Sequence, residues 1–67
     1  MTEQNKDVFD ALLSGNKELD SAFRLYVAAK YLAEDKDVQM EILGFEKDLI
    51  DVEQRVISLM MRLNNEV

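Results

Sequence analysis

The sequence contains no cysteine, no histidine, no proline and no tryptophan. Without cysteine the chain can form neither a disulfide nor a thiolate metal site, and without histidine it lacks the commonest zinc ligand. A single core in a chain of 67 residues supplies only about 3–5 kcal/mol, so such chains usually need a further source of stability. Disulfides and zinc are excluded, so self-association or a host protein remains. We therefore expect a homo-oligomer.

The absence of proline means that nothing forces a helix to break anywhere along the chain. Only two glycines are present, and no Asn-Gly or Asp-Gly pair marks a β-hairpin turn. Strand-forming residues do not alternate with polar ones over any stretch. The sequence therefore predicts an all-α fold.

Basic residues are scarce: eight stand against fourteen acidic ones, which gives a net charge of −6. Nucleic acid repels such a chain, so we expect no direct nucleic-acid binding. Anionic lipid is disfavoured for the same reason, and no apolar run approaches the length of a membrane span. The first residues, Met1-Thr2-Glu3-Gln4, lack the basic and apolar parts of a signal peptide. These features predict a cytoplasmic protein, in a bacterium or, if a phage encodes it, in the cytosol of its host.

Catalytic residue types are missing as well. The serines have no histidine to activate them, and so short a chain leaves no room for a substrate pocket of ordinary size. Glu46 and Glu53 lie one heptad apart, but we expect them to pair with Lys30, Arg24 or a partner chain. The sequence predicts no enzyme, no catalytic residue, no cofactor and no metal ion.

The last thirty residues carry one apolar residue at alternating steps of four and three. This heptad pattern predicts one long helix, over about 37–64, with a continuous apolar seam. A second stripe on the same helix consists of Leu43, Ile50 and Ile57, seven residues apart. We interpret the two stripes as two contacts, one with the rest of the chain and one with a second molecule. The seam positions are Val38, Ile42, Phe45, Leu49, Val52, Val56, Leu59 and Leu63.

Two further helices are expected before the long one, over about 3–13 and about 17–34. The break between them is placed at Ser14-Gly15-Asn16, because glycine favours the backbone that ends a helix and asparagine can cap the next one. A charged stretch at 34–37 precedes the third helix. The sequence thus predicts three helices in one domain spanning 1–67, an antiparallel hairpin or bundle completed by homodimerisation.

Charges along the seam suggest how two copies pair. The residues just before four seam positions are Glu41, Asp48, Arg55 and Arg62, acidic in the first half and basic in the second. An antiparallel dimer brings Asp48 near Arg55, whereas a parallel one sets acidic groups side by side. A simpler alternative is that the gradient only complements the helix dipole. The predicted dimer interface comprises Ile42, Phe45, Leu49, Val52, Val56, Leu59 and Leu63, with Asp48 and Arg55.

These predicted surfaces indicate only a general class of function. We expect a small acidic adaptor or regulator, such as an inhibitor, a co-chaperone or an assembly factor, that binds a protein partner. The candidate target-binding residues are Phe9, Leu13, Met60 and Met61. Methionines suit adaptable contacts, although they also fill gaps in a core.

A second function remains open. The acidic residues Asp37, Glu41, Asp48 and Asp51 share the polar side of the predicted long helix. Such a row can imitate the phosphates of nucleic acid and so block a DNA- or RNA-binding protein.

Overall fold

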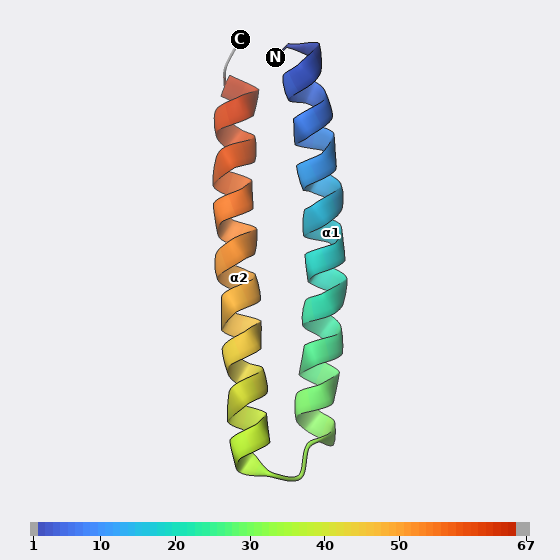
Figure 1. The fold of residues 1–67 in the computed structure, drawn as a ribbon, viewed down its shortest axis with the longest axis vertical. Coiled ribbons are helices and arrows are strands. Elements are labelled where there is room, and N and C mark those ends of the chain that lie inside the picture. The colour runs from blue at the N-terminus through green and yellow to red at the C-terminus, as the bar shows by residue number, and fades with distance from the viewer. Residues whose placement is uncertain (1, 66–67) are drawn as a thin grey trace.

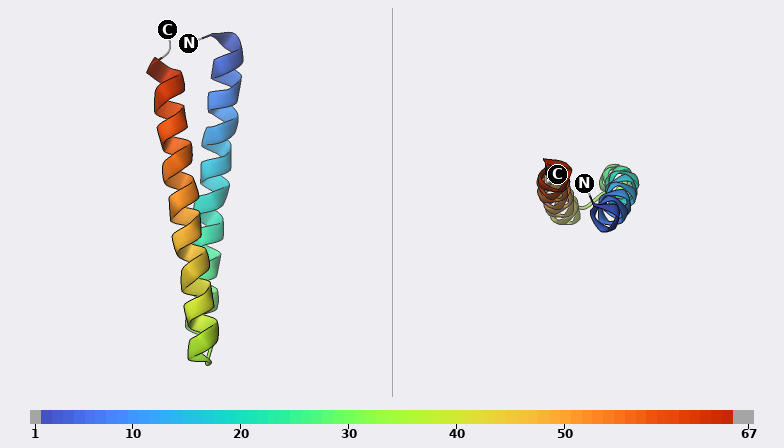
Figure 2. Two further views of the ribbon diagram at one scale, coloured as in Figure 1. Left: turned by 60° about the vertical axis from the view of Figure 1, so that its left-hand side comes forward. Right: turned by 90° about the horizontal axis from the view of Figure 1, so that it is seen from above.

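The computed structural model describes residues 2–65 and consists of two antiparallel helices, α1 (Glu3–Leu32) and α2 (Lys36–Asn65) (Figure 1). A short connection at 33–35 joins them, and the first turn of α1 and the last turn of α2 lie at the opposite end of the hairpin. The helices run side by side, slightly inclined to one another (Figure 2). The result is one layer of two helices, 51 × 15 × 10 Å overall.

The first half of the chain forms one helix, so the prediction of three helices is wrong. Ser14-Gly15-Asn16 lies inside α1, and neither glycine has a positive φ. A glycine within a helix costs about 1 kcal/mol relative to alanine. Contacts with α2 outweigh that cost, because the heptad spacing continues through the expected break as Leu12, Asn16 and Leu19. The all-α class and the antiparallel hairpin are confirmed.

Side chains at the helix ends fix where each helix begins and how the connection closes. Thr2 Oγ1 accepts a hydrogen bond from a backbone N–H of the first turn at 3.1 Å. Asp35 Oδ1 accepts one from the Asp37 N–H at 2.7 Å and so caps α2. Gln39 Nε2 donates to the carbonyl oxygen of Ala33 at 2.7 Å, which ties α2 to the end of α1.

The contact between the helices is narrow. Among residues 2–65 the buried side chains are Ile42, Glu46, Met60 and Leu63, and none of them is less than 2% exposed. The long helix was predicted to within a residue at each end. Its contact with α1, however, combines half of the predicted seam with the residues that lie between the two predicted stripes. The positions of α2 along this line are Gln39, Ile42, Glu46, Leu49, Glu53, Val56, Met60 and Leu63.

Candidate protein-binding surface

One side of the hairpin presents a long apolar surface built by both helices. On α2 it consists of Val38, Phe45, Val52 and Leu59, spaced seven residues apart, and on α1 it includes Tyr26. We call these five residues the Phe45 face. The rings of Tyr26 and Phe45 meet edge to face, with centroids 5.9 Å apart. Phe45 is still 49% exposed and Val52 41% exposed, so α1 covers this side only in part.

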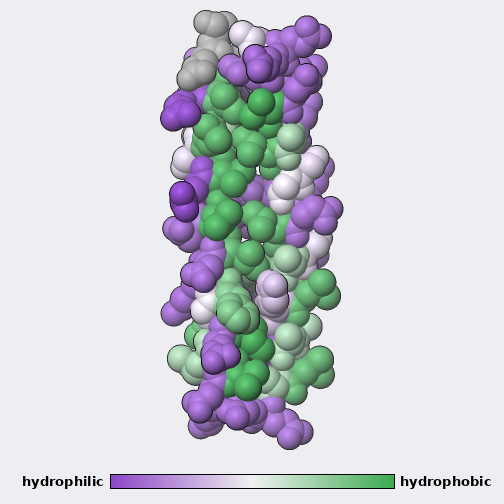
Figure 3. Space-filling model, viewed as in Figure 1, coloured by the Kyte–Doolittle hydropathy of each residue, from purple (hydrophilic) through white to green (hydrophobic). Residues whose placement is uncertain are grey.

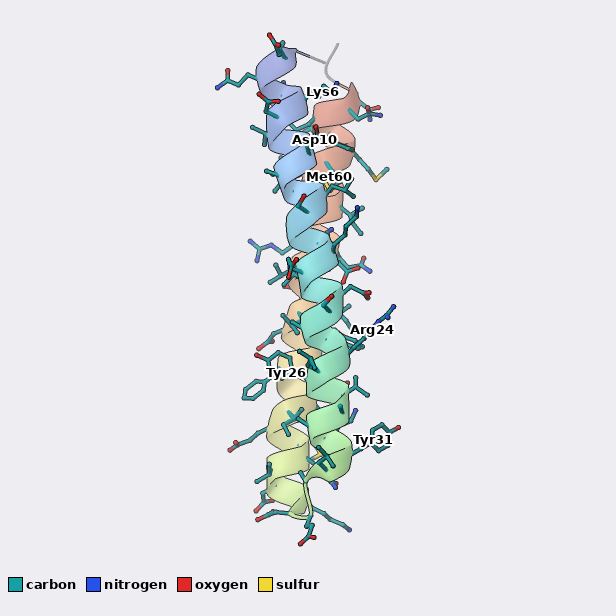
Figure 4. The ribbon with its side chains drawn as sticks, turned by 90° about the vertical axis from the view of Figure 1, so that its right-hand side faces the viewer. Lys6, Asp10, Arg24, Tyr26, Tyr31 and Met60 are labelled. Atoms are coloured by element: carbon teal, nitrogen blue, oxygen red, sulfur yellow. The ribbon has the colours of Figure 1, made fainter. Side chains whose placement is uncertain are left out.

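The apolar surface extends from α2 onto α1. Tyr26 points to the side of the hairpin that faces the viewer in Figure 1, whereas Tyr31 points away from it (Figure 4). On the side of Tyr26, apolar side chains form a band over both helices along most of their length (Figure 3). Leu25 and Ala29 lie next to Tyr26 on α1 by helical spacing, and Leu25 is 71% exposed. This face therefore has the width of two helices.

A shallow hollow lies along the edge of the Phe45 face. It has a volume of about 350 Å³ and is lined by Val52, Arg55, Val56 and Leu59. Its wall is aliphatic apart from one guanidinium group. A surface of this shape suits an aliphatic side chain of another helix, flanked by a carboxylate, better than a polar small molecule.

Exposed charges border this face on its outer edge. Glu41, Asp48, Arg55 and Arg62 are spaced seven apart and all exposed. Asp48 follows Phe45 by three residues and precedes Val52 by four, so helical geometry places it beside both. Within the described part of the chain, none of the four takes part in an ion pair. The edge is thus acidic in one half, basic in the other, and open to a partner.

The opposite side of the hairpin is apolar as well, and an ion pair connects the two helices there. Leu43, Ile50 and Ile57 of α2 lie there with Leu13 and Val27 of α1, and we call these five the Ile50 face. Ile50 and Ile57 are 46% and 42% exposed. The second predicted stripe of α2 is therefore also left partly uncovered.

Lys30 and Glu46 link the two helices on the side of the Ile50 face. Lys30 Nζ donates a hydrogen bond to Glu46 Oε1 at 3.1 Å and lies 2.9 Å from Oε2. The carboxylate is the deeper group, with a side chain 7% exposed against 27% for the lysine. This confirms one of the pairings expected for Glu46. Arg24 instead pairs with Asp20 on the surface of α1 at 3.2 Å, where an exposed pair contributes little.

The predicted dimer interface divides into two groups in the structure. Ile42 and Leu63 are buried, and Leu49 and Val56 half-buried, in the line that faces α1. These four residues form part of the contact between the two helices of one chain. Four of the seven apolar residues of the predicted interface are therefore already used within the chain. The others remain available to a second molecule: Phe45 and Val52 are exposed, Leu59 is half-buried, and Asp48 and Arg55 are exposed.

The candidate target-binding residues divide in the same way. Met60 is buried at 8% exposure and Phe9 is half-buried, so both lie in the contact between the helices. Met60 thus fills a gap in the core. Leu13 and Met61 remain exposed, at 41% and 62%. Sequence reasoning placed Tyr26 on an apolar side of its helix but did not name it as a candidate site residue, although its spacing of seven from Leu19 could have placed it beside α2.

Other kinds of site find little support in the described chain. No cluster of three acidic residues over 2–65 could hold a metal ion together. Neither α1 nor α2 has an apolar stretch long enough to cross a bilayer. The proposed phosphate-like row is exposed at Asp37, Glu41, Asp48 and Asp51.

Comparison of the chain with protein-family models, with curated proteins and with solved structures found no match.

Proposed function

We propose that this protein is a helical adaptor or regulator that works by binding other polypeptides through the apolar faces of its hairpin. The observation that carries the proposal is the imbalance between buried and exposed apolar side chains. Only Ile42, Met60 and Leu63 are buried in the described residues, whereas thirteen large apolar side chains are exposed. Large contiguous apolar patches on small proteins usually mark sites of protein interaction.

The shape of the hairpin supports the same proposal. Its radius of gyration is 15.5 Å, whereas a compact domain of this length has about 11 Å. Helices bury an apolar stripe by packing against another layer, and domains are normally built from at least two layers. This hairpin has one layer and two uncovered faces. Another polypeptide can supply the missing layer on either face.

The alternative function, mimicry of nucleic acid, has weaker support. A mimic needs a run of negative charge, as along a phosphate backbone. Glu41 and Asp48 begin such a run, but Arg55 and Arg62 continue the same line. The edge therefore carries as many positive as negative charges. The apolar faces, by contrast, extend along most of the hairpin.

Site-specific photo-crosslinking in the native cell tests this proposal. A photoreactive phenylalanine analogue is placed at Val52 on the Phe45 face, at Ile57 on the Ile50 face, and at Asp51 on the exposed outer side of α2 as the matched control. We expect crosslinks to polypeptide from position 52 or 57 and none from position 51. Absence of crosslinks above the control from both faces would rule out the proposed function.

Salt dependence separates an adaptor from a mimic once a captured partner is purified. Apolar burial is almost insensitive to salt, whereas contacts between exposed charges are screened beyond a few ångströms at high ionic strength. We expect the affinity to change less than about threefold between low salt and half-molar salt. A fall of about 100-fold or more would favour the mimic.

A further inference from the structure

We infer that the Phe45 face is covered by a second copy of this chain, with the two α2 helices antiparallel, so that two hairpins form a four-helix bundle. The inference rests on the proposed role of the apolar faces in protein binding, and it names the occupant of one of them. The arrangement keeps the antiparallel register expected from the sequence. It changes the contact surface, because half of the seam is already used within the chain.

The accessible area has the size that such a partner would cover. The chain exposes 5360 Å², whereas a compact monomer of 7.8 kDa exposes about 4,400 Å². The excess is therefore roughly 1,000 Å² per chain. A stable protein interface of standard size buries about 800 Å² on each partner. The excess accessible area of the chain is therefore about what one stable dimer interface would cover.

The register of the exposed charges matches the length of the helix. Setting Asp48 beside Arg55 of the second copy also places Leu49 level with Val52. In that register the two ends of α2, Lys36 and Asn65, are level with each other as well. The two α2 helices then overlap along their whole length. A register chosen by charge alone has no reason to coincide with the ends of the helix.

Charge complementarity fixes the orientation. A two-fold axis perpendicular to the helices sets the acidic half of the edge, Glu41 and Asp48, against the basic half, Arg55 and Arg62, of the other copy. Symmetry makes each pair occur twice. An exposed pair contributes only a few tenths of a kcal/mol. These pairs therefore select the antiparallel orientation, and the apolar contact supplies the affinity.

Small residues on α1 let the second hairpin come close. Gly15, Ala22 and Ala29 are spaced seven apart on α1, on the line next to Tyr26. The distance between packed helix axes, about 8–10 Å, depends on the size of the side chains between them. A line of small residues allows the shorter distance. Leu25, exposed beside this line, would then be covered.

Sedimentation equilibrium of matched variants tests the assignment of the face. Val52→Asp places a carboxylate on the Phe45 face, and Ile50→Asp places one at similar exposure on the opposite face. We expect wild type and Ile50→Asp to sediment at twice 7.8 kDa at tens of micromolar. Val52→Asp should weaken dimerisation by about 100-fold or more, because burying an unpaired charge is costly. Circular dichroism checks that each variant stays helical.

Disulfide trapping tests the register without disturbing the apolar contact. The chain has no native cysteine, so Asp48→Cys and Arg55→Cys each introduce one thiol. We expect an oxidised mixture of the two variants to give a 48–55 crosslinked dimer, and each variant alone to give none. Disulfide formation requires Cα atoms closer than about 7 Å. In this register the two copies of position 48 are separated by about 7.5 Å along the axis, and the two copies of position 55 by about 13.5 Å.

Some outcomes would overturn the inference and leave the proposed function standing. These are a wild type that stays monomeric at tens of micromolar, a dimer broken by Ile50→Asp and not by Val52→Asp, and a self-crosslink of Asp48→Cys. In each of these cases photo-crosslinks from position 52 to a different polypeptide would identify the true occupant of the Phe45 face. Failure of the proposed function is the separate result that neither face crosslinks to any polypeptide.

Discussion

Glu46 occupies a position in α2 where a coiled coil usually has an apolar residue. Its carboxylate is almost fully removed from solvent, and Lys30 is its one cation partner over residues 2–65. The lysine is more exposed than the glutamate and can extend its ammonium group into water. Removing the lysine therefore leaves a buried carboxylate without a cation, whereas removing the glutamate leaves a lysine that can reach water.

This asymmetry predicts unequal effects of single substitutions. Lys30→Met leaves a buried carboxylate without a cation and should lower the free energy of unfolding by about 3 kcal/mol. Glu46→Gln keeps a hydrogen-bond acceptor for the lysine and should cost about 1 kcal/mol. Urea denaturation monitored by circular dichroism measures both, with a stabilising osmolyte added because the total stability of so small a chain is low.

The double variant Lys30→Met/Glu46→Leu is the control for that prediction. Replacing both charges by apolar groups is often neutral or stabilising, so it should unfold at or above the urea midpoint of the wild type. Equal losses for the two single variants would contradict the burial difference on which the prediction depends.

Gly44 gives a second prediction for a single residue. It lies within α2, its φ is not positive, and an added Cβ would meet nothing within 4 Å. Gly44→Ala should therefore raise the free energy of unfolding by about 1 kcal/mol through helix propensity alone. Gly44→Pro should lower it by about 2 kcal/mol, the difference between glycine and proline in a helix interior. A loss of stability in Gly44→Ala, measured by thermal denaturation, would show that a neighbour absent from the single hairpin fills this space.

The two helices were predictable to different degrees. The ends of α2 were predicted to within a residue because its apolar residues keep the heptad spacing without interruption. The continuity of α1 was missed because Ser14-Gly15-Asn16 has the local chemistry of a helix end. Asn16 in fact occupies the heptad position between Leu12 and Leu19, with its side-chain oxygen buried and unpartnered. The packing of α1 against α2 outweighed the preference of Ser14-Gly15-Asn16 to end a helix.

The side of α2 that meets α1 was not predictable from α2 alone. The line of α2 that contacts α1 includes Glu46 and Glu53. A prediction based only on the positions of apolar residues places such charged residues on the solvent-exposed side of the helix. At Glu46 the ion pair with Lys30 compensates for the burial of the carboxylate. Only the pairing of the two helices shows which side is used. Of the candidate interface residues, Phe45 and Val52 are therefore exposed, whereas Ile42 and Leu63 are buried within the chain.

The charged edge of α2 predicts rescue by exchange of charges. In the antiparallel dimer, Asp48→Arg or Arg55→Asp alone sets like charges together at two symmetric places. Each should weaken dimerisation by about tenfold at low salt, since two attractions of a few tenths of a kcal/mol are lost and two repulsions of similar size are gained. The double variant Asp48→Arg/Arg55→Asp should restore the wild-type dissociation constant to within about threefold. Sedimentation velocity measures all three.

Ionic strength provides the control for the charge exchange. At high salt the differences among these variants should shrink, because exposed charges are screened, while the apolar contact persists. If the double variant were weaker than both single variants at low salt, Asp48 and Arg55 would not lie opposite each other.

At the scale of the whole molecule, the hairpin is a single layer of two helices, whereas domains are normally built from at least two layers. One narrow line of contacts holds two long helices together, and two apolar faces stay open. Covering one face with a second copy gives each helix neighbours on two sides, as in a four-helix bundle. The dimer then contributes stability that the single hairpin lacks. That stability depends on protein concentration, since association is linked to folding by mass action.

This linkage predicts that the thermal midpoint rises with concentration. A tenfold increase contributes about 1.4 kcal/mol per dimer, or roughly 0.7 kcal/mol per chain. For a domain of this size that corresponds to a shift of about 3–5 °C. Ile50→Asp should show the same slope, whereas Val52→Asp, which keeps the hairpin but loses the second copy, should unfold at one temperature at all concentrations. A wild-type midpoint that does not move over a hundredfold range would mean that the hairpin is stable alone and that its apolar faces are held open for a different partner.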